Sequence, residues 1–255
     1  MMRIPCFPMV VLLSGLLACG GGTSTPPATA GAVSGNWQFI LQKTPTAQPR
    51  IQSGFLLQSG RSVSGSLLLN GSCATVGPVM GTITGGSISL VVSNTGQTVQ
   101  LDGTVASGAT AMSGTYTILA QGCGSSENGT WSATLIRPLN GSFHGTFTSS
   151  HQGGSVFSAS GSIAQEINTG ANVATLTGTI TSTGSPCLST ANISGAISGT
   201  NVVLTFIAGN GTQIGQVIAQ STPDASSLTG NYLFGSQRAG ACFSGDAGRV
   251  SINLP

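Results

Sequence analysis

The fold is decided by residues 87–120, which read SISLVVSNTGQTVQLDGTVASGATAMSGTYTILA. Apolar and small polar residues alternate through three runs, Ser87–Ser93, Gln97–Val105 and Ala111–Ala120, and short links containing Gly separate the runs. Alternation with period two puts one set of side chains on each face of a strand, and short links of this composition are typical of turns. This stretch therefore predicts three consecutive antiparallel strands that share one apolar face.

The same pattern continues on both sides, and no convincing helical periodicity appears from Gly35 onward. In the first half, the other predicted strands are Gly35–Gln42, Ser53–Ser59, Ser62–Asn70, Val79–Thr84 and Gly129–Ile136. The predicted core is the face that carries Trp37, Phe39, Leu41, Val63, Leu67, Leu69, Ile88, Leu90, Val92, Val99, Leu101, Val105, Met112, Tyr116, Ile118, Trp131, Ala133 and Leu135. The Ser, Thr and Gln face is expected to meet water.

The second half repeats the order of the first. WSATL at 131–135 corresponds to VSINL at 250–254, and MSGTY at 112–116 corresponds to LTGNY at 228–232. Matches that keep their order over about 100 residues indicate an internal duplication. We place the boundary near Arg137-Pro138, because proline ends a strand.

Eight strands joined by short links favour an up-and-down barrel, since closure removes the exposed sheet edges at which chains aggregate. We therefore predict an all-β protein of two tandem antiparallel eight-stranded meander barrels, at residues 34–137 and 138–255. The alternative is two immunoglobulin-like β-sandwiches, for which eight short strands are also suitable.

Composition excludes several classes of protein. Only 5% of the residues are charged, against roughly 25% in an ordinary soluble chain. A coiled coil needs flanking charged residues, and a nucleic-acid binder needs a dense cationic surface. The chain has neither, so its surface is expected to be solvated by hydroxyl groups and by the backbone.

The first 18 residues have the features of a signal peptide. Arg3 is followed by the apolar stretch MVVLLSGLL at 9–17, which is shorter than the roughly 20 residues that span a bilayer. Leu16-Leu17-Ala18-Cys19 resembles the bacterial lipobox. That resemblance implies cleavage after Ala18 and acylation of Cys19 with diacylglycerol and palmitate, which would anchor the chain in a bilayer.

A linker is predicted after the anchor. Residues 19–33 comprise the lipidated Cys19 and a Gly- and Pro-rich tether. Because residue 20 is Gly and not Asp, the lipoprotein resemblance implies sorting to the outer membrane of the cell envelope.

A second resemblance concerns the barrel. Gly35-Asn36-Trp37 is similar to the G-x-W that opens the first strand of calycins, the group of lipocalins and avidins. The resemblance implies that Arg137, at the end of the eighth strand, packs over Trp37. In the second half, Gly141-Ser142-Phe143 replaces the tryptophan, and Arg249 precedes the core of the last strand.

Four cysteines remain in the predicted domains: Cys73, Cys123, Cys187 and Cys242. Four cysteines permit three pairings, and the duplication favours one bridge per domain, Cys73 with Cys123 and Cys187 with Cys242. The bridged links lie on opposite sides of an eight-stranded barrel, so we expect each bridge to fold two loops across one mouth.

The sequence contains no constellation that indicates catalysis. The carboxylates are scattered singly, Glu127-Asn128-Gly129 is interpreted as a turn, and no known metal-binding or phosphate-binding motif is present. We expect no enzyme activity, cofactor, metal or nucleic-acid partner. Four aromatic residues are candidates for packing or for contact with a ligand: Trp37, Tyr116, Trp131 and Tyr232.

The expected function is that of a membrane-anchored envelope lipoprotein with a structural or interaction role. Its partners would be the lipid bilayer, through Cys19, and another envelope component. The alternative is a module with calycin-like barrels that binds a small ligand or a carbohydrate.

Overall fold

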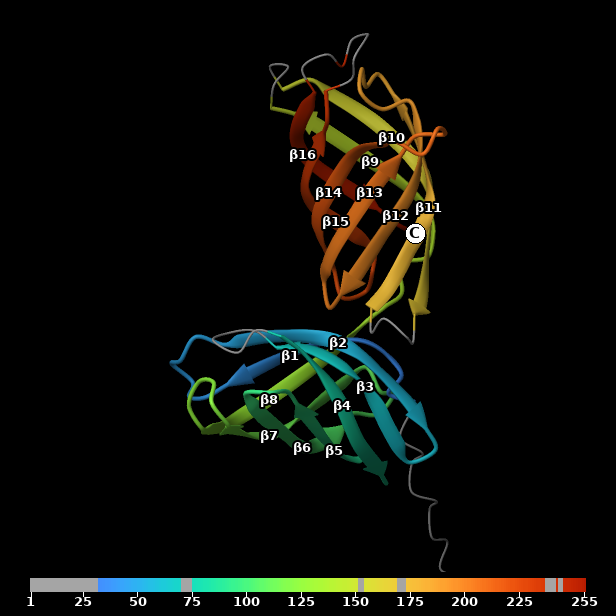
Figure 1. The fold of residues 1–255 in the computed structure, drawn as a ribbon. Coiled ribbons are helices and arrows are strands. Elements are labelled where there is room, and N and C mark those ends of the chain that lie inside the picture. The colour runs from blue at the N-terminus through green and yellow to red at the C-terminus, as the bar shows by residue number, and fades with distance from the viewer. Residues whose placement is uncertain (1–31, 70–74, 151–153, 169–172, 237–241, 243–244) are drawn as a thin grey trace, which may run out of the picture.

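The chain forms two closed antiparallel barrels of eight strands each (Figure 1). The computed structural model describes residues 32–69, 75–150, 154–168, 173–236, 242 and 245–255. The first barrel contains β1 (Gly35–Gln42), β2 (Arg50–Ser59), β3 (Ser62–Leu69), β4 (Thr75–Thr84), β5 (Ser87–Ser93), β6 (Gln97–Val105), β7 (Ala111–Ala120) and β8 (Glu127–Ile136). The second contains β9 (Gly141–Ser149), β10 (Val156–Asn168), β11 (Val173–Thr183), β12 (Thr190–Ser198), β13 (Asn201–Ile207), β14 (Gln213–Ser221), β15 (Ser227–Phe234) and β16 (Asp246–Asn253).

Each barrel is a simple meander in which every strand pairs with the next and the last strand pairs with the first. β1 closes on β8, and β9 closes on β16. The prediction of an all-β chain with two eight-stranded meander barrels is confirmed, and the immunoglobulin-like alternative is wrong. The predicted signal peptide, Cys19 and most of the predicted tether lie outside the described residues.

The strand boundaries differ from expectation mainly where strands begin. β2 starts at Arg50 and β4 at Thr75, earlier than predicted. Glu127-Asn128-Gly129 was expected to be a turn but forms the first part of β8, with Asn128 paired to Thr117 of β7. The turn interpretation failed because Glu127 faces inward, where tertiary contacts override the local preference of Asn-Gly.

The interior of the first barrel is filled by its own side chains. Trp37, Phe39 and Trp131 are buried, and the Phe39 and Trp131 rings lie 5.8 Å apart. Every residue of the predicted core is buried except Val105 and Leu135, which are partly buried against the same cluster.

Paired glycines make room for the Trp131 indole. Gly103 and Gly114 are cross-strand neighbours on β6 and β7. A Cβ on Gly103 would lie 2.9 Å from the Trp131 ring, and a Cβ on Gly114 would lie 1.9 Å from the Asp102 carbonyl oxygen. The indole Nε1 donates to the carbonyls of Asp102 and Thr115, at 3.2 and 3.0 Å.

The calycin-like feature at Trp37 takes a different form from the one expected. Trp37 is fully buried, and its Nε1 donates to the carbonyl oxygen of Val33 at 2.8 Å. Val33 is itself fully buried. Arg137 is exposed, and its backbone N–H donates to the carbonyl of Pro223 in the second barrel. The N-terminal segment, rather than Arg137, therefore meets the indole.

The second barrel has an aromatic core. Phe147 stacks on Phe157 with 5.0 Å between the ring centroids, and Tyr232 and Phe234 pack against them. Phe206 extends the cluster through Phe234. Both interiors are thus occupied by large side chains, as expected for small barrels.

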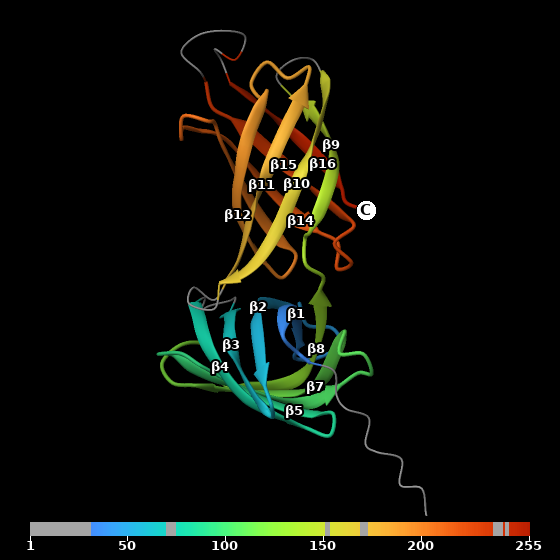
Figure 2. The same ribbon diagram turned by 90° about the vertical axis from the view of Figure 1, so that its right-hand side faces the viewer.

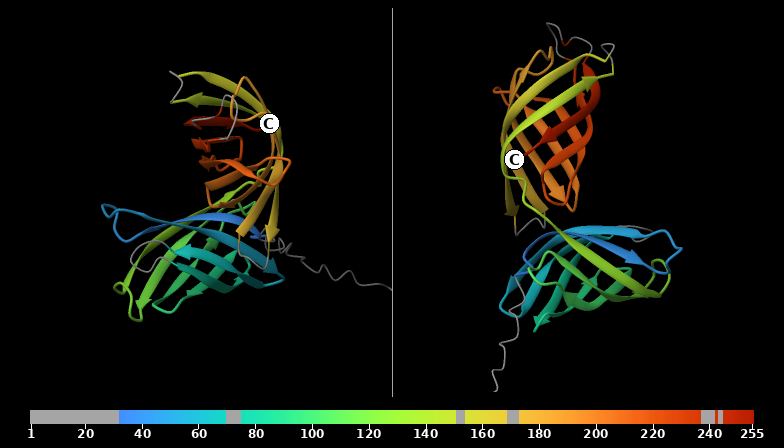
Figure 3. Two further views of the ribbon diagram at one scale, coloured as in Figure 1. Left: turned by 45° about the horizontal axis from the view of Figure 1, so that its top comes forward. Right: turned by 180° about the vertical axis from the view of Figure 1, so that it is seen from behind.

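The second barrel stands with one end against the side of the first, over β1 and β2 (Figures 1 and 2). Asn36 and Phe55 are cross-strand partners that point outward from the first barrel, yet both are buried. Phe55 belongs to the core cluster of the second barrel. The views in Figure 3 show the same arrangement, with the two barrel axes in different directions.

Hydrogen bonds fix the β12–β13 turn to this face. The Asn36 side chain donates to the Gly199 carbonyl at 2.8 Å and accepts from the Gly199 N–H at 2.7 Å. The hydroxyls of Ser53 and Ser198 are 2.8 Å apart. Gly199 has a φ of 58°, and a Cβ there would lie 2.7 Å from the Cβ of Ser53. This position therefore requires glycine for both its backbone angle and its close approach.

We expect Asn36→Ala to loosen the joint between the barrels. The substitution leaves the buried N–H and C=O of Gly199 without partners, which costs about 2 kcal/mol. The urea midpoint of the first unfolding transition should fall, and small-angle scattering should report a broader distribution of shapes. Asn128→Ala, at an exposed residue of β8, is the control and should change neither. Wild-type scattering and midpoint in Asn36→Ala would show that the joint does not depend on this amide.

Candidate functional site

The four aromatic candidates all point into the barrels. Trp37, Tyr116, Trp131 and Tyr232 are each at most 3% exposed. Their neighbours are core side chains of the same barrel. The structure therefore gives them packing roles, and for the tyrosines it adds a polar contact.

Tyr116 shares a buried carboxylate with a cation. Its hydroxyl donates to Glu127 Oε1 at 3.0 Å. Arg50 Nη2 lies 2.6 Å from the same oxygen, and Lys43 Nζ lies 3.8 Å from Oε2. The Glu127 side chain is 2% exposed, whereas that of Arg50 is 37% exposed. A buried acid at this end of the barrel is thus neutralised by a cation that reaches in from the rim.

Tyr232 has an equivalent carboxylate in the second barrel. Its hydroxyl donates to Asp246 Oδ2 at 2.8 Å, and Ser149 Oγ donates to Oδ1 at 2.5 Å. Asp246 is 1% exposed. In both barrels the acid lies two residues before the glycine that pairs with the tyrosine, Gly129 for Tyr116 and Gly248 for Tyr232.

The two pairs occupy one position in the duplicated fold, but their surroundings differ. In the first barrel Arg50 lies opposite Leu41; the equivalent strand position in the second barrel is Phe157, opposite Phe147. Phe157 packs on Tyr232 with 5.9 Å between the ring centroids. The first barrel therefore ends in a charged cluster, and the second ends in aromatic rings.

These environments act on the tyrosine hydroxyls in the same direction. Burial, together with the hydrogen bond and negative charge of Glu127, raises the pKa of Tyr116 to about 12. Burial and the corresponding contacts with Asp246 also raise the pKa of Tyr232. Both phenols thus stay protonated at neutral pH as donors to the carboxylates, an arrangement that stabilises the barrel end.

Three of the cysteines, Cys123, Cys187 and Cys242, lie at the same barrel ends. Cys187 and Cys242 form a disulfide with 4.8 Å between their Cα atoms, and both residues belong to the buried core cluster. The bridge joins the β11–β12 link to the β15–β16 link across the second barrel. Cys123 is also disulfide-bonded. Cys73 lies outside the described residues, so the Cys73–Cys123 pairing stays a prediction.

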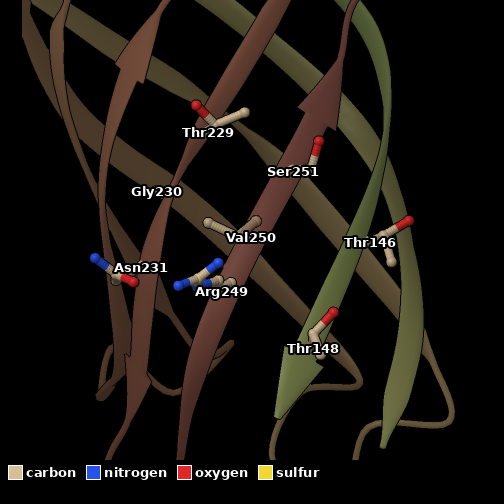
Figure 4. A pocket seen from close by; sticks show the side chains of 8 residues that line it. All are labelled: Thr146, Thr148, Thr229, Gly230, Asn231, Arg249, Val250 and Ser251. Carbon is tan, nitrogen blue, oxygen red and sulfur yellow. The ribbon is translucent and has the colours of Figure 1, made fainter. Parts of the chain in front are cut away.

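A hollow of about 490 Å³ lies on the outer face of β9, β15 and β16. Figure 4 shows the side chains that line it, with Arg249 between Asn231 and Thr148. A second hollow, of about 530 Å³, lies at the β13–β14 turn beside Gly235. The first hollow lies outside the barrel interior, whereas the second lies at one end of the barrel, where Ile214 of its lining packs against the core cluster.

The register arranges the first hollow as two rows of outward side chains. Arg249 pairs with Asn231 on one side and Thr148 on the other. Two residues along, Ser251 pairs with Thr229 and Thr146. All six residues are exposed. The rows form a polar surface with one cation on its central strand, and we call these six residues the Arg249 surface.

The first barrel has the same rows without the charge. The residue equivalent to Arg249 is Thr130, which pairs with Thr115 and Gln42. In the other row Ser132 pairs with Ser113 and Ile40. The two outer faces therefore differ in the charge of Arg249 and in Ile40, an exposed apolar residue at the position of Thr146. Sequence reasoning noted Arg249 only for its place in the strand. A lone Arg in an alternating run of Ser and Thr was the available signal.

The Arg249 surface can bind an anionic group but holds no acid–base pair. A guanidinium offers five N–H donors in a planar fork that matches a carboxylate. The hydroxyl and amide side chains around it both donate and accept. Among the described residues, no group of three or more His, Cys, Asp or Glu side chains is placed to hold a metal ion. In the same part of the chain, no helix is long and apolar enough to cross a membrane.

Comparisons with known proteins assign no family. No family model and no curated protein matches the chain. Among solved structures, kievitone hydratase from Nectria haematococca is similar at 12% sequence identity over 91% of each chain, with a TM-score of 0.23. A TM-score at that level has no weight for the function of this chain.

The Tyr116 pair predicts a loss of stability at high pH. Its pKa is near 12 in the folded chain and about 10 when unfolded. The unfolded state therefore loses its proton first, so this stabilisation is complete below pH 10 and falls as the pH rises toward 12. Denaturant unfolding of Tyr116→Phe, compared with the wild type, should show a shallower decline across that range. An unchanged slope would contradict the role of the pair.

Proposed function

We propose that this protein is a lipid-anchored component of the bacterial cell envelope with a structural or interaction role. Its two barrels would act as a scaffold that presents their outer faces to another envelope component. The role is non-enzymatic and requires no cofactor.

The observation that carries this proposal is the filling of both barrels. Trp37, Phe39 and Trp131 occupy the first interior, and the cluster around Phe147 and Phe157 occupies the second. Proteins that hold a drug-sized ligand enclose it in a pocket of roughly 300–1,000 Å³. The hollow of about 490 Å³ lies on the outer face of the second barrel. Contacts with a partner are therefore best supported on the outer faces.

The anchor rests on the sequence. Leu16-Leu17-Ala18-Cys19 supplies the lipobox-like segment, and residues 19–33 supply the tether. Two or more acyl chains on Cys19 give stable membrane attachment without a spanning segment. The disulfide between Cys187 and Cys242 supports an oxidising compartment outside the cytoplasm. Gly20, where Asp would retain the protein in the inner membrane, favours the outer membrane.

Cys19→Ala tests the anchor. In a bacterial host, the wild type should incorporate a palmitate analogue and fractionate with the outer membrane, whereas Cys19→Ala should do neither. Cys6→Ala is the matched control, because Cys6 lies inside the predicted signal peptide, and it should behave as wild type. Equal labelling of Cys19→Ala would contradict the lipoprotein assignment.

Native mass spectrometry tests whether the barrels are filled by protein alone. The detergent-solubilised chain should have the mass of the polypeptide with its acyl chains and its disulfides. A bound compound of a few hundred daltons, released only when the barrels unfold, would instead support the small-ligand alternative. Acid hydrolysis would identify acyl chains and separate them from such a compound.

A further inference from the structure

We propose that the Arg249 surface, made of Thr146, Thr148, Thr229, Asn231, Arg249 and Ser251, binds a carboxylate-bearing saccharide of the envelope. This inference rests on the proposed function and deepens it, because it gives the outer-face contact a place and a ligand chemistry. The polar residues, the lone cation and the hollow itself all bear on the choice of ligand.

The positive charge of Arg249 favours an anionic ligand. Both ion pairs found among the described residues involve Glu127, at the end of the first barrel, so neither involves Arg249. Asp246 begins the same strand, but its carboxylate is buried with Tyr232 and Ser149. Arg249 thus presents its guanidinium to solvent with no counter-ion in the described part of the chain. A single such fork suits one carboxylate better than a polyanion, which needs several cations.

The two rows of polar side chains favour a ligand rich in hydroxyl groups. Cross-strand neighbours are about 5 Å apart, so three strands give a surface roughly 10 Å wide. Two residues along a strand add roughly 7 Å. Besides Arg249, Val250 and Gly230, the lining consists of three Thr, one Ser and one Asn. Hydroxyl and amide groups that both donate and accept can match the hydroxyls of a sugar ring.

The hollow lacks the features of a site for an apolar or peptide side chain. Val250 is buried and belongs to the core cluster, so it offers the ligand its backbone and little apolar surface. The exposed apolar residues Val156 and Ile218 pair with Thr148 and Asn231 at the two ends of one row, but neither lines the hollow. An anchor residue of a protein partner normally enters an apolar pocket. Because all six side chains are exposed, the surface is also open enough for a polymer to pass across it.

The test uses the full chain in detergent micelles and trigalacturonate as the probe, measured by titration calorimetry. We expect a Kd on the order of 1 mM, as for a short ligand on an open surface. Arg249→Gln should weaken binding about 10-fold or more. Arg249→Lys should give an intermediate affinity, because it keeps the charge but loses the planar fork. Arg61→Gln removes an exposed arginine from the first barrel and should bind as the wild type.

Two further ligands separate the contributions of the carboxylate and the hydroxyls. The fully methyl-esterified trimer should bind at least about 10-fold more weakly than trigalacturonate, and so should acetate. Equal affinity for the ester would overturn the role of the carboxylate. Equal affinity for acetate would overturn the assignment of a saccharide. Absence of trigalacturonate binding, or unchanged affinity in Arg249→Gln, would overturn the site itself.

These outcomes are separate from those of the proposed function. A chain that is acylated at Cys19, and whose barrels carry no internal ligand, but that does not bind trigalacturonate, would refute only the site. A chain that binds trigalacturonate but is not acylated would refute only the anchor.

Discussion

The backbone pairing of the last strand with the first is the constraint on which the rest of this structure depends. A chain with 5% charged residues has few Lys or Glu side chains to protect the edge of an open sheet. Pairing β1 with β8 and β9 with β16 leaves neither sheet with an edge. Once the sheets close, their inner faces define small cylinders, and the side chains must fill them. The exposed positions can then be uncharged, because hydroxyl groups suffice to solvate a surface that has no unpaired strand.

Large aromatic side chains fit inside such a cylinder only where the neighbouring strand positions carry glycine. Gly103 and Gly114 lie side by side where Trp131 enters the first barrel. Gly129 and Gly248 lie beneath the Tyr116 and Tyr232 rings, since a Cβ on either would fall within 3.0 Å of the ring. The glycines therefore contribute to the packing, because the tyrosine rings occupy the space that side chains at these positions would fill. The tyrosine hydroxyls donate hydrogen bonds to Glu127 and Asp246 at the barrel ends, and both carboxylates are buried.

Much of this architecture could be predicted from the sequence, because period-two alternation fixes which residues face inward. The strands at Ser87–Ser93, Gln97–Val105 and Ala111–Ala120 matched expectation at both ends. Alternation does not tell which partners a polar residue contacts once the barrel has closed. The prediction of a turn at Glu127 was wrong for this reason. Its partners Arg50 and Tyr116 come from two other strands. The Arg249 surface was missed for the same reason, since its two rows exist only when β9 closes on β16.

The joint at Asn36 and Gly199 has a consequence for evolution. One amide side chain and one glycine are part of the contact that holds one end of the second barrel, whose other end points away from the first barrel (Figure 1). A small displacement at such a pivot is magnified with distance, as at the end of a lever. Substitutions at these two residues could therefore redirect everything that the second barrel displays while leaving both cores intact. Related chains with identical barrels could differ chiefly in the orientation of the second barrel relative to the first.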